Sequence, residues 1–96
     1  MISTKALPFN KFRVTFILDR EDPPVPISVV GPFNDWTPGA TRLRNRADGL
    51  RSATVVVPAG TEVAFRYLAD DGTWRDDPDV HDRDEHGNPV FTVGPA

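Results

Sequence analysis

The chain contains no cysteine among its 96 residues, which excludes a disulfide framework and any metal site built on thiolates. It has no apolar run long enough for a signal peptide or a membrane-spanning helix. No segment repeats its apolar residues with the period of an α-helix over a useful length. The 11 basic and 14 acidic groups leave a net charge of −3, which is unfavourable for general polyanion binding. We therefore predict one small domain in a reducing cytoplasm, with neither nucleic acid nor a membrane as partner.

Ten prolines and seven glycines divide the chain into short segments, and several of these alternate apolar and polar residues as strands do. The alternation is clearest at 11–18 and at 62–69. Asp48-Gly49 and Asp71-Gly72 are dipeptides that favour hairpin turns. The predicted strands are residues 11–18, 27–30, 41–45, 50–57, 62–69, a short segment beginning at Trp74, and 90–93.

These segments predict an all-β fold, an immunoglobulin-like β-sandwich of about seven antiparallel strands. We assign residues 11–93 to a single domain, residues 1–10 to an N-terminal extension and residues 94–96 to a tail. Three prolines within residues 21–26 predict a loop there. Alternation along the strands predicts that the following side chains are buried: Phe12 or Val14, Val29, Val55, Phe65, Tyr67 and Phe91.

Each of the two tryptophans stands at the end of a predicted turn. Trp36 ends the segment Gly31-Pro32-Phe33-Asn34-Asp35-Trp36, and Trp74 follows Asp71-Gly72. A flat indole beside polar neighbours can stack on the apolar face of a sugar ring, but large aromatic residues also fill the cores of small domains. The pattern alone leaves both interpretations open.

The first tryptophan segment resembles the G-x-F-N-x-W signature of the family 48 carbohydrate-binding modules. That family includes the glycogen-binding module of the AMP-activated protein kinase beta subunit and the N-terminal domains of isoamylases and glycogen-branching enzymes. Similar motifs follow in the same order, and the resemblance covers roughly residues 11–93. These motifs are Pro58-Ala59-Gly60, Phe65-Arg66-Tyr67, Asp71-Gly72-Thr73-Trp74, Asp77-Pro78 and Gly87-Asn88.

The resemblance implies an early-set immunoglobulin-like sandwich and an α-1,4-glucan such as glycogen or starch as ligand. Trp36 and Trp74 match the family tryptophans that stack on glucose rings. Arg66 stands where binding members often have a lysine that donates to sugar hydroxyls, and Asn88 matches the asparagine that hydrogen-bonds the sugar. We expect a stand-alone monomer without a cofactor, whose partner is an α-glucan or a glucan-active enzyme.

The alternative is an immunoglobulin-like protein-interaction module that has kept the sandwich and lost the sugar site. In that case both indoles would be buried, and Arg66 would pair with a carboxylate such as Asp35 or Asp76. We do not predict an enzyme, because neither histidine has a nucleophile beside it and so small a domain rarely encloses a cleft that could perturb its carboxylates.

Two charged segments have simpler interpretations. Residues 82–87 follow the opening of a calcium loop, but Val93 occupies the twelfth position, where such a loop needs a bidentate glutamate. We therefore predict a solvated acidic loop without a metal. Four arginines that have no aromatic residues between them predict a solvated basic hairpin rather than a nucleic-acid groove. They are Arg42, Arg44, Arg46 and Arg51.

Overall fold

The computed structural model describes residues 1–20, 25–77 and 79–94, and within them the chain is all-β, as predicted. None of these residues belongs to a helix that is long and apolar enough to cross a membrane. The predicted loop at 21–26 and the tail at 94–96 lie partly outside the described residues, as does Pro78. The elements are β1 (Ile2–Leu7), β2 (Lys11–Asp19), β3 (Ile27–Val30), the 3-10 turn η1 (Pro32–Asn34), β4 (Arg44–Asn45), β5 (Leu50–Pro58), β6 (Glu62–Ala64), β7 (Arg66–Ala69), β8 (Trp74–Arg75) and β9 (Val90–Thr92).

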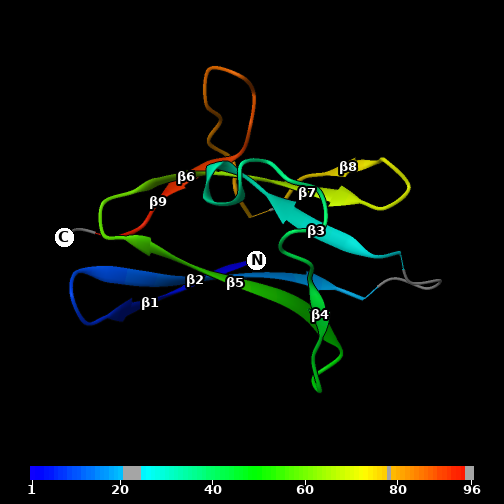
Figure 1. Ribbon diagram of the computed structural model, residues 1–96, viewed down its shortest axis with the longest axis horizontal. Coiled ribbons are helices and arrows are strands. Elements are labelled where there is room, and N and C mark those ends of the chain that lie inside the picture. Colours follow the sequence, from blue (N-terminus) through cyan, green and yellow to red (C-terminus); the bar gives the residue numbers. More distant parts are fainter. Residues whose placement is uncertain (21–24, 78, 95–96) are drawn as a thin grey trace.

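The strands form two layers, and every strand pairing is antiparallel (Figure 1). One layer is a four-stranded sheet in the order β1-β2-β5-β4, and the other contains β3-β7-β8 and β6-β9. The strand predicted at 62–69 is divided between two sheets, because β6 pairs with β9 whereas β7 pairs with β3 and β8. Phe65 lies at this division and donates its N–H to the carbonyl of Pro89 at 3.1 Å.

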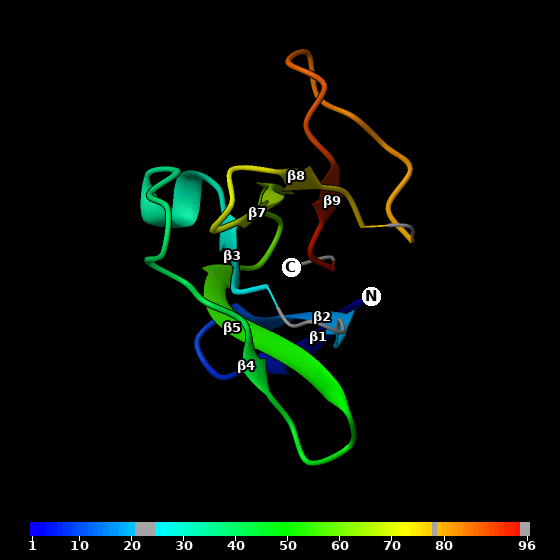
Figure 2. The ribbon, with the colours of Figure 1, turned by 90° about the vertical axis from the view of Figure 1, so that its right-hand side faces the viewer.

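The strand predicted at 41–45 passes from one layer to the other. Its first half pairs with β3, because Val29 donates its N–H to the carbonyl of Thr41 and Leu43 donates to Ile27, each at 2.9 Å. Its second half is β4, which pairs with β5 across the predicted Asp48-Gly49 turn. Figure 2 shows this segment running from η1 along one side of the sandwich to β4. The segment therefore joins the two layers along one edge, and Leu43 is buried between them.

Residues 1–10, for which the sequence predicts only an N-terminal extension, contain strand β1. It pairs with β2 from Ile2 opposite Phe16 to Leu7 opposite Lys11. Only Ile2 and Leu7 are partly buried, and the four residues between them are exposed. An edge strand that buries so little shows no apolar alternation, so only its backbone pairing with β2 reveals it.

The core is built around Phe16 on β2, which is fully buried. Its ring centre lies 5.0 Å from that of Phe65 and 5.8 Å from that of Phe33. Tyr67 and Phe91 make edge contacts with the same ring, at 6.3 and 6.4 Å. These five rings come from both layers and from η1, so a single cluster joins all parts of the sandwich.

Most of the predicted core is confirmed. Val14, Val29, Phe65 and Tyr67 are fully buried. The side chains of Val55 and Phe91 were predicted to be buried but are only partly so, and Phe12 is similar. Phe91 lies on the edge strand β9, and β4 pairs with β5 only at Arg51 and Ser52, so Val55 lies beyond the end of the short neighbour.

We expect Phe16→Ala to lower the free energy of unfolding by about 3–5 kcal/mol, because the cavity opens where the two layers meet. Urea unfolding followed by circular dichroism measures this loss. The matched control is Phe9→Ala, since Phe9 is 92% exposed and its removal should change stability by less than about 0.5 kcal/mol. Similar losses in both variants would contradict the central role of Phe16.

A buried carboxylate, Asp77, lies at the end of the same cluster. It accepts hydrogen bonds from the hydroxyl of Tyr67 at 2.8 Å, the ammonium of Met1 at 2.7 Å and the N–H of Asp79 at 2.9 Å. Burial by itself raises the pKa of Asp77, but these hydrogen bonds outweigh burial and hold the pKa below its ordinary value. Burial and the neighbouring Asp77 together raise the pKa of Tyr67. The Asp of the Asp77-Pro78 motif therefore has a structural use.

We expect Asp77→Asn to destabilise the fold by about 2–3 kcal/mol at neutral pH, because the amide replaces an acceptor of charge-assisted hydrogen bonds. A carboxylate with a lowered pKa stabilises the fold above its unfolded pKa, and this contribution disappears as the pH falls through the folded pKa. The difference between the two proteins should therefore shrink below about pH 4. Urea unfolding of the wild type and Asp77→Asn at several pH values measures this difference in the free energy of unfolding. The control is Asp76→Asn, because Asp76 is exposed. An equal, pH-independent loss of stability in both variants would contradict the structural role of the Asp77 carboxylate.

Candidate functional site

The signature segment at 31–36 combines residues that build the fold with one that faces solvent. A Cβ on Gly31 would lie 2.5 Å from the carbonyl oxygen of Ala64 and 2.6 Å from the ring of Phe33. Only glycine permits this close approach between the turn after β3 and the backbone of β6. Phe33 packs on Phe16 and is only partly exposed. Both residues are therefore explained by packing.

Asn34 fastens η1 to the strands on either side of it. Its Nδ2 donates to the carbonyl of Val29 at 2.9 Å and to Oγ1 of Thr41 at 3.1 Å. Its Oδ1 accepts the N–H of Gly31 at 3.1 Å. The amide of Asn34 is thus occupied within the fold and holds the turn against β3.

Trp36 is the residue of this segment that the fold does not bury. It is 37% exposed, and its N–H donates to the carbonyl of Gly31 at 2.9 Å. Its φ is 57°, a left-handed conformation that is unusual for a bulky side chain. Asp35 before it has a φ of 55°. The turn therefore holds Trp36 at the surface in a backbone conformation that the residue does not favour by itself.

Trp74 faces outward on β8, beside β7. It pairs with Leu68 in register, and Leu68 and Arg66 share one side of β7 because side chains alternate along a strand. Tyr67 between them points into the core. Trp74 is 54% exposed, and Cζ of Arg66 lies 5.8 Å from the centre of its ring, within the range of a cation–π contact.

Arg66 is held by the backbone and not by an acid. Its Nη2 donates to the carbonyl of Gly87 at 3.2 Å. Its Nε is buried and has no hydrogen-bond partner in the described part of the chain. The carboxylate pairing considered for a lost sugar site is not present, since Asp76 faces Arg83 at 3.5 Å and no ion pair of Arg66 occurs within the described residues. The guanidinium therefore keeps donors that no carboxylate of the described residues neutralises.

Asn88 follows Gly87 in the chain, and its side chain is tied to its own loop. Asp84 accepts the backbone N–H of Asn88 at 2.9 Å and its Nδ2 at 3.2 Å, and also the N–H of His86 at 2.9 Å. The backbone hydrogen bond from Asn88 is the main reason that the pKa of Asp84 lies below its ordinary value. Within the described residues no group of three or more potential ligands is placed to hold a metal ion. Asp84 thus organises this loop from within.

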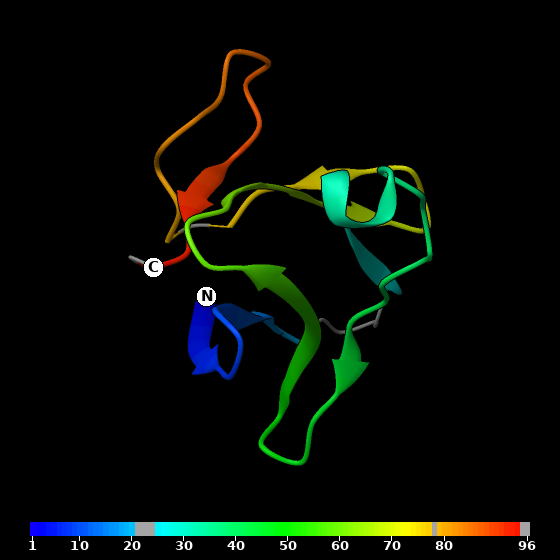
Figure 3. The same ribbon diagram turned by 60° about the vertical axis from the view of Figure 1, so that its left-hand side comes forward.

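The four predicted site residues are brought together in part. Arg66 contacts Trp74, and through Gly87 it touches the loop that carries Asn88. Trp36 lies beyond the end of β3, whose last residue Val30 pairs with Arg66. Figures 1 and 3 show η1 in the layer of β3, β7 and β8, away from β1, β2 and β5. Among the described residues no ring contact joins the two indoles.

Two groups in this region were not predicted as part of a site. Leu68 is half-buried beside Trp74, and the carbonyl of Gly87 positions Arg66. The period-two alternation already places Leu68 on the same side as Arg66, so the sequence carried a signal for it. A backbone carbonyl in a distant loop has no sequence signal.

No family model matches the chain, and no curated protein matches it.

Proposed function

We propose that this chain is a non-catalytic carbohydrate-binding module for α-1,4-glucan, resembling the family 48 modules. The proposal rests above all on Trp74, which is 54% exposed and has the Arg66 guanidinium 5.8 Å from its ring centre. Trp36, two residues after the end of η1, is a second exposed indole. Solvent-exposed indoles also favour this function over the interaction-module alternative, for which we expect both rings to be buried.

The chemistry of this surface suits a sugar chain. The open faces of the indoles offer apolar platforms to the C–H groups of glucose rings. The Arg66 guanidinium supplies donors for hydroxyl oxygens, and the loop of Asn88 lies next to it. The surface is open, so we expect a Kd no tighter than tens of micromolar, which corresponds to about 6–7 kcal/mol.

We propose no catalytic role for this module. Asp77 is the buried carboxylate of the described residues, and it is occupied by hydrogen bonds inside the fold. We place the protein in the cytoplasm, with which a chain without cysteine is compatible, and expect a monomer. Its partner would be a glucan or an enzyme that acts on one.

We expect Trp74→Ala and Trp36→Ala each to weaken retention on amylose, because each removes one stacking platform of about 1 kcal/mol. Affinity electrophoresis in gels containing amylose or glycogen measures the retention. Phe9→Ala is the matched control, since it removes an aromatic ring that is 92% exposed on another part of the fold. If the wild-type protein is not retained, the glucan-binding proposal fails and the protein-interaction module becomes the favoured function.

We expect Arg66→Ala to weaken glucan binding by about 1–2 kcal/mol, as hydrogen bonds from a charged donor are lost, while stability changes little. Titration with maltoheptaose, followed by tryptophan fluorescence, measures the affinity of both proteins. Arg83→Ala is the control, because this arginine faces Asp76 in an exposed pair. Equal affinities of Arg66→Ala and the wild type would remove Arg66 from the site.

A further inference from the structure

Strand pairing gathers basic side chains on the outer side of the β1-β2-β5-β4 sheet. Val14 and Phe16 of β2 point into the core. Arg13, which directly precedes Val14, and the other residues on its side of the strand therefore point outward. Lys5 lies opposite Arg13 in register, and Arg44 lies opposite Ser52. We call this surface the basic face, and its cations are Lys5, Lys11, Arg13 and Arg44.

These four cations pair with no other described residue. Within the described residues no side-chain hydrogen bond or ion pair involves any of them. In contrast, Arg42 pairs with Asp70 at 3.1 Å and Arg46 with Asp48 at 2.9 Å. Eight of the 14 acidic residues lie between residues 70 and 86, and the loop that follows β8 projects from the opposite layer (Figures 1 and 2). A chain of negative net charge thus presents a positively charged sheet surface.

The basic face also carries exposed apolar side chains. Phe9 lies at the tip of the β1–β2 hairpin, just beyond the closing pair of Leu7 and Lys11, and is 92% exposed. Val56 lies opposite Arg13 and is 53% exposed. A surface that combines cations with an aromatic residue at a projecting tip is typical of attachment to the interface of a bilayer.

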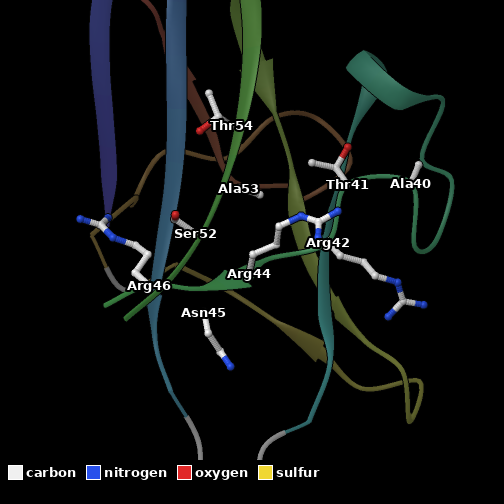
Figure 4. A pocket seen from close by; sticks show the side chains of 9 residues that line it. All are labelled: Ala40, Thr41, Arg42, Arg44, Asn45, Arg46, Ser52, Ala53 and Thr54. Carbon is white, nitrogen blue, oxygen red and sulfur yellow. The ribbon is translucent and has the colours of Figure 1, made fainter. Parts of the chain in front are cut away.

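One end of the basic face is hollowed. A concavity of about 500 Å³ is lined by Arg44 together with the hydroxyls of Thr41, Ser52 and Thr54, among other residues. Figure 4 shows the guanidinium of Arg44 in the middle of this region, while the side chains of Arg42 and Arg46 extend away from it on opposite sides. A guanidinium among hydroxyl groups is suited to the oxygens of a phosphate group.

We propose that the basic face docks on an anionic lipid membrane, with Phe9 entering the interface and Arg44 binding a headgroup phosphate. Apart from Phe9 at the hairpin tip, no described residue of the basic face is aromatic. Nucleic-acid bases would need a row of rings to stack on, so a single ring at the tip suits a lipid interface better. The sequence predicts no membrane partner, because it has no spanning segment and a net charge of −3. The cations of the basic face are dispersed from residue 5 to residue 44, and only strand pairing brings them together. An anionic membrane repels the acidic loop on the opposite layer, and this repulsion turns the basic face toward the membrane.

Co-sedimentation with vesicles of phosphatidylcholine alone, and of phosphatidylcholine mixed with phosphatidylserine, tests this proposal. We expect the protein to bind the anionic vesicles only. This binding should weaken as salt rises from about 0.1 M to 1 M, because the screening length falls from about 10 to 3 Å. Lys5→Gln, Arg13→Gln and Arg44→Gln should each weaken binding about fivefold. Phe9→Ser should weaken it about tenfold.

Arg83→Gln is the charge-matched control, because Arg83 lies in the acidic loop, and it should bind anionic vesicles like the wild type. Trp74→Ala should also bind them normally, which separates this surface from the proposed glucan site. The proposal is overturned if the wild type does not bind anionic vesicles at low salt, if it binds neutral vesicles equally well, or if Arg83→Gln loses as much as Arg13→Gln. Binding to duplex DNA without binding to anionic vesicles would assign the face to nucleic acid and equally overturn it.

Discussion

The packing of Phe16 against Phe65 and Phe33 is the contact on which the rest of the molecule depends. Phe16 belongs to one layer, Phe65 marks the division between two sheets of the other layer, and Phe33 belongs to η1. The cluster therefore holds the layers together and also anchors the turn that presents Trp36. Any loss of this packing acts on the candidate sugar surface as well as on stability, so variants at the surface need a stability measurement beside the binding measurement.

The six-residue signature divides into structural and exposed parts once its contacts are known. Gly31 permits a close backbone approach, Phe33 fills the core, and Asn34 fastens the turn. Only Trp36 remains with an exposed ring for a ligand. Asp77 of the later motif likewise serves the core. A match to such motifs therefore argues for a fold more strongly than for a ligand, since most of the matching residues are needed for packing.

The two outward surfaces of the sandwich differ in chemistry because the two layers draw on different parts of the chain. The β7–β8 surface carries Trp74 and a guanidinium that a backbone carbonyl holds. The basic face carries an exposed phenylalanine and cations that pair with none of the residues the structure describes. Since a β-sandwich exposes both of its outer sides, one small domain has room for two separate surfaces, and a substitution on one leaves the other intact.

Apart from β1, the sequence alone determined which segments become strands and which way most of their side chains point, because the alternation of apolar residues is local. It placed Tyr67 inside and Arg66 outside, and it located the turns before Leu50 and Trp74. Only the tertiary structure decided the partners: the pairing of residues 2–7 with β2, the division of residues 62–69 at Phe65, and the contact of Arg66 with a loop 21 residues away. It also decided that both indoles face solvent and that dispersed cations share a face. These features depend on which distant strands pair, and no periodicity within one segment records that.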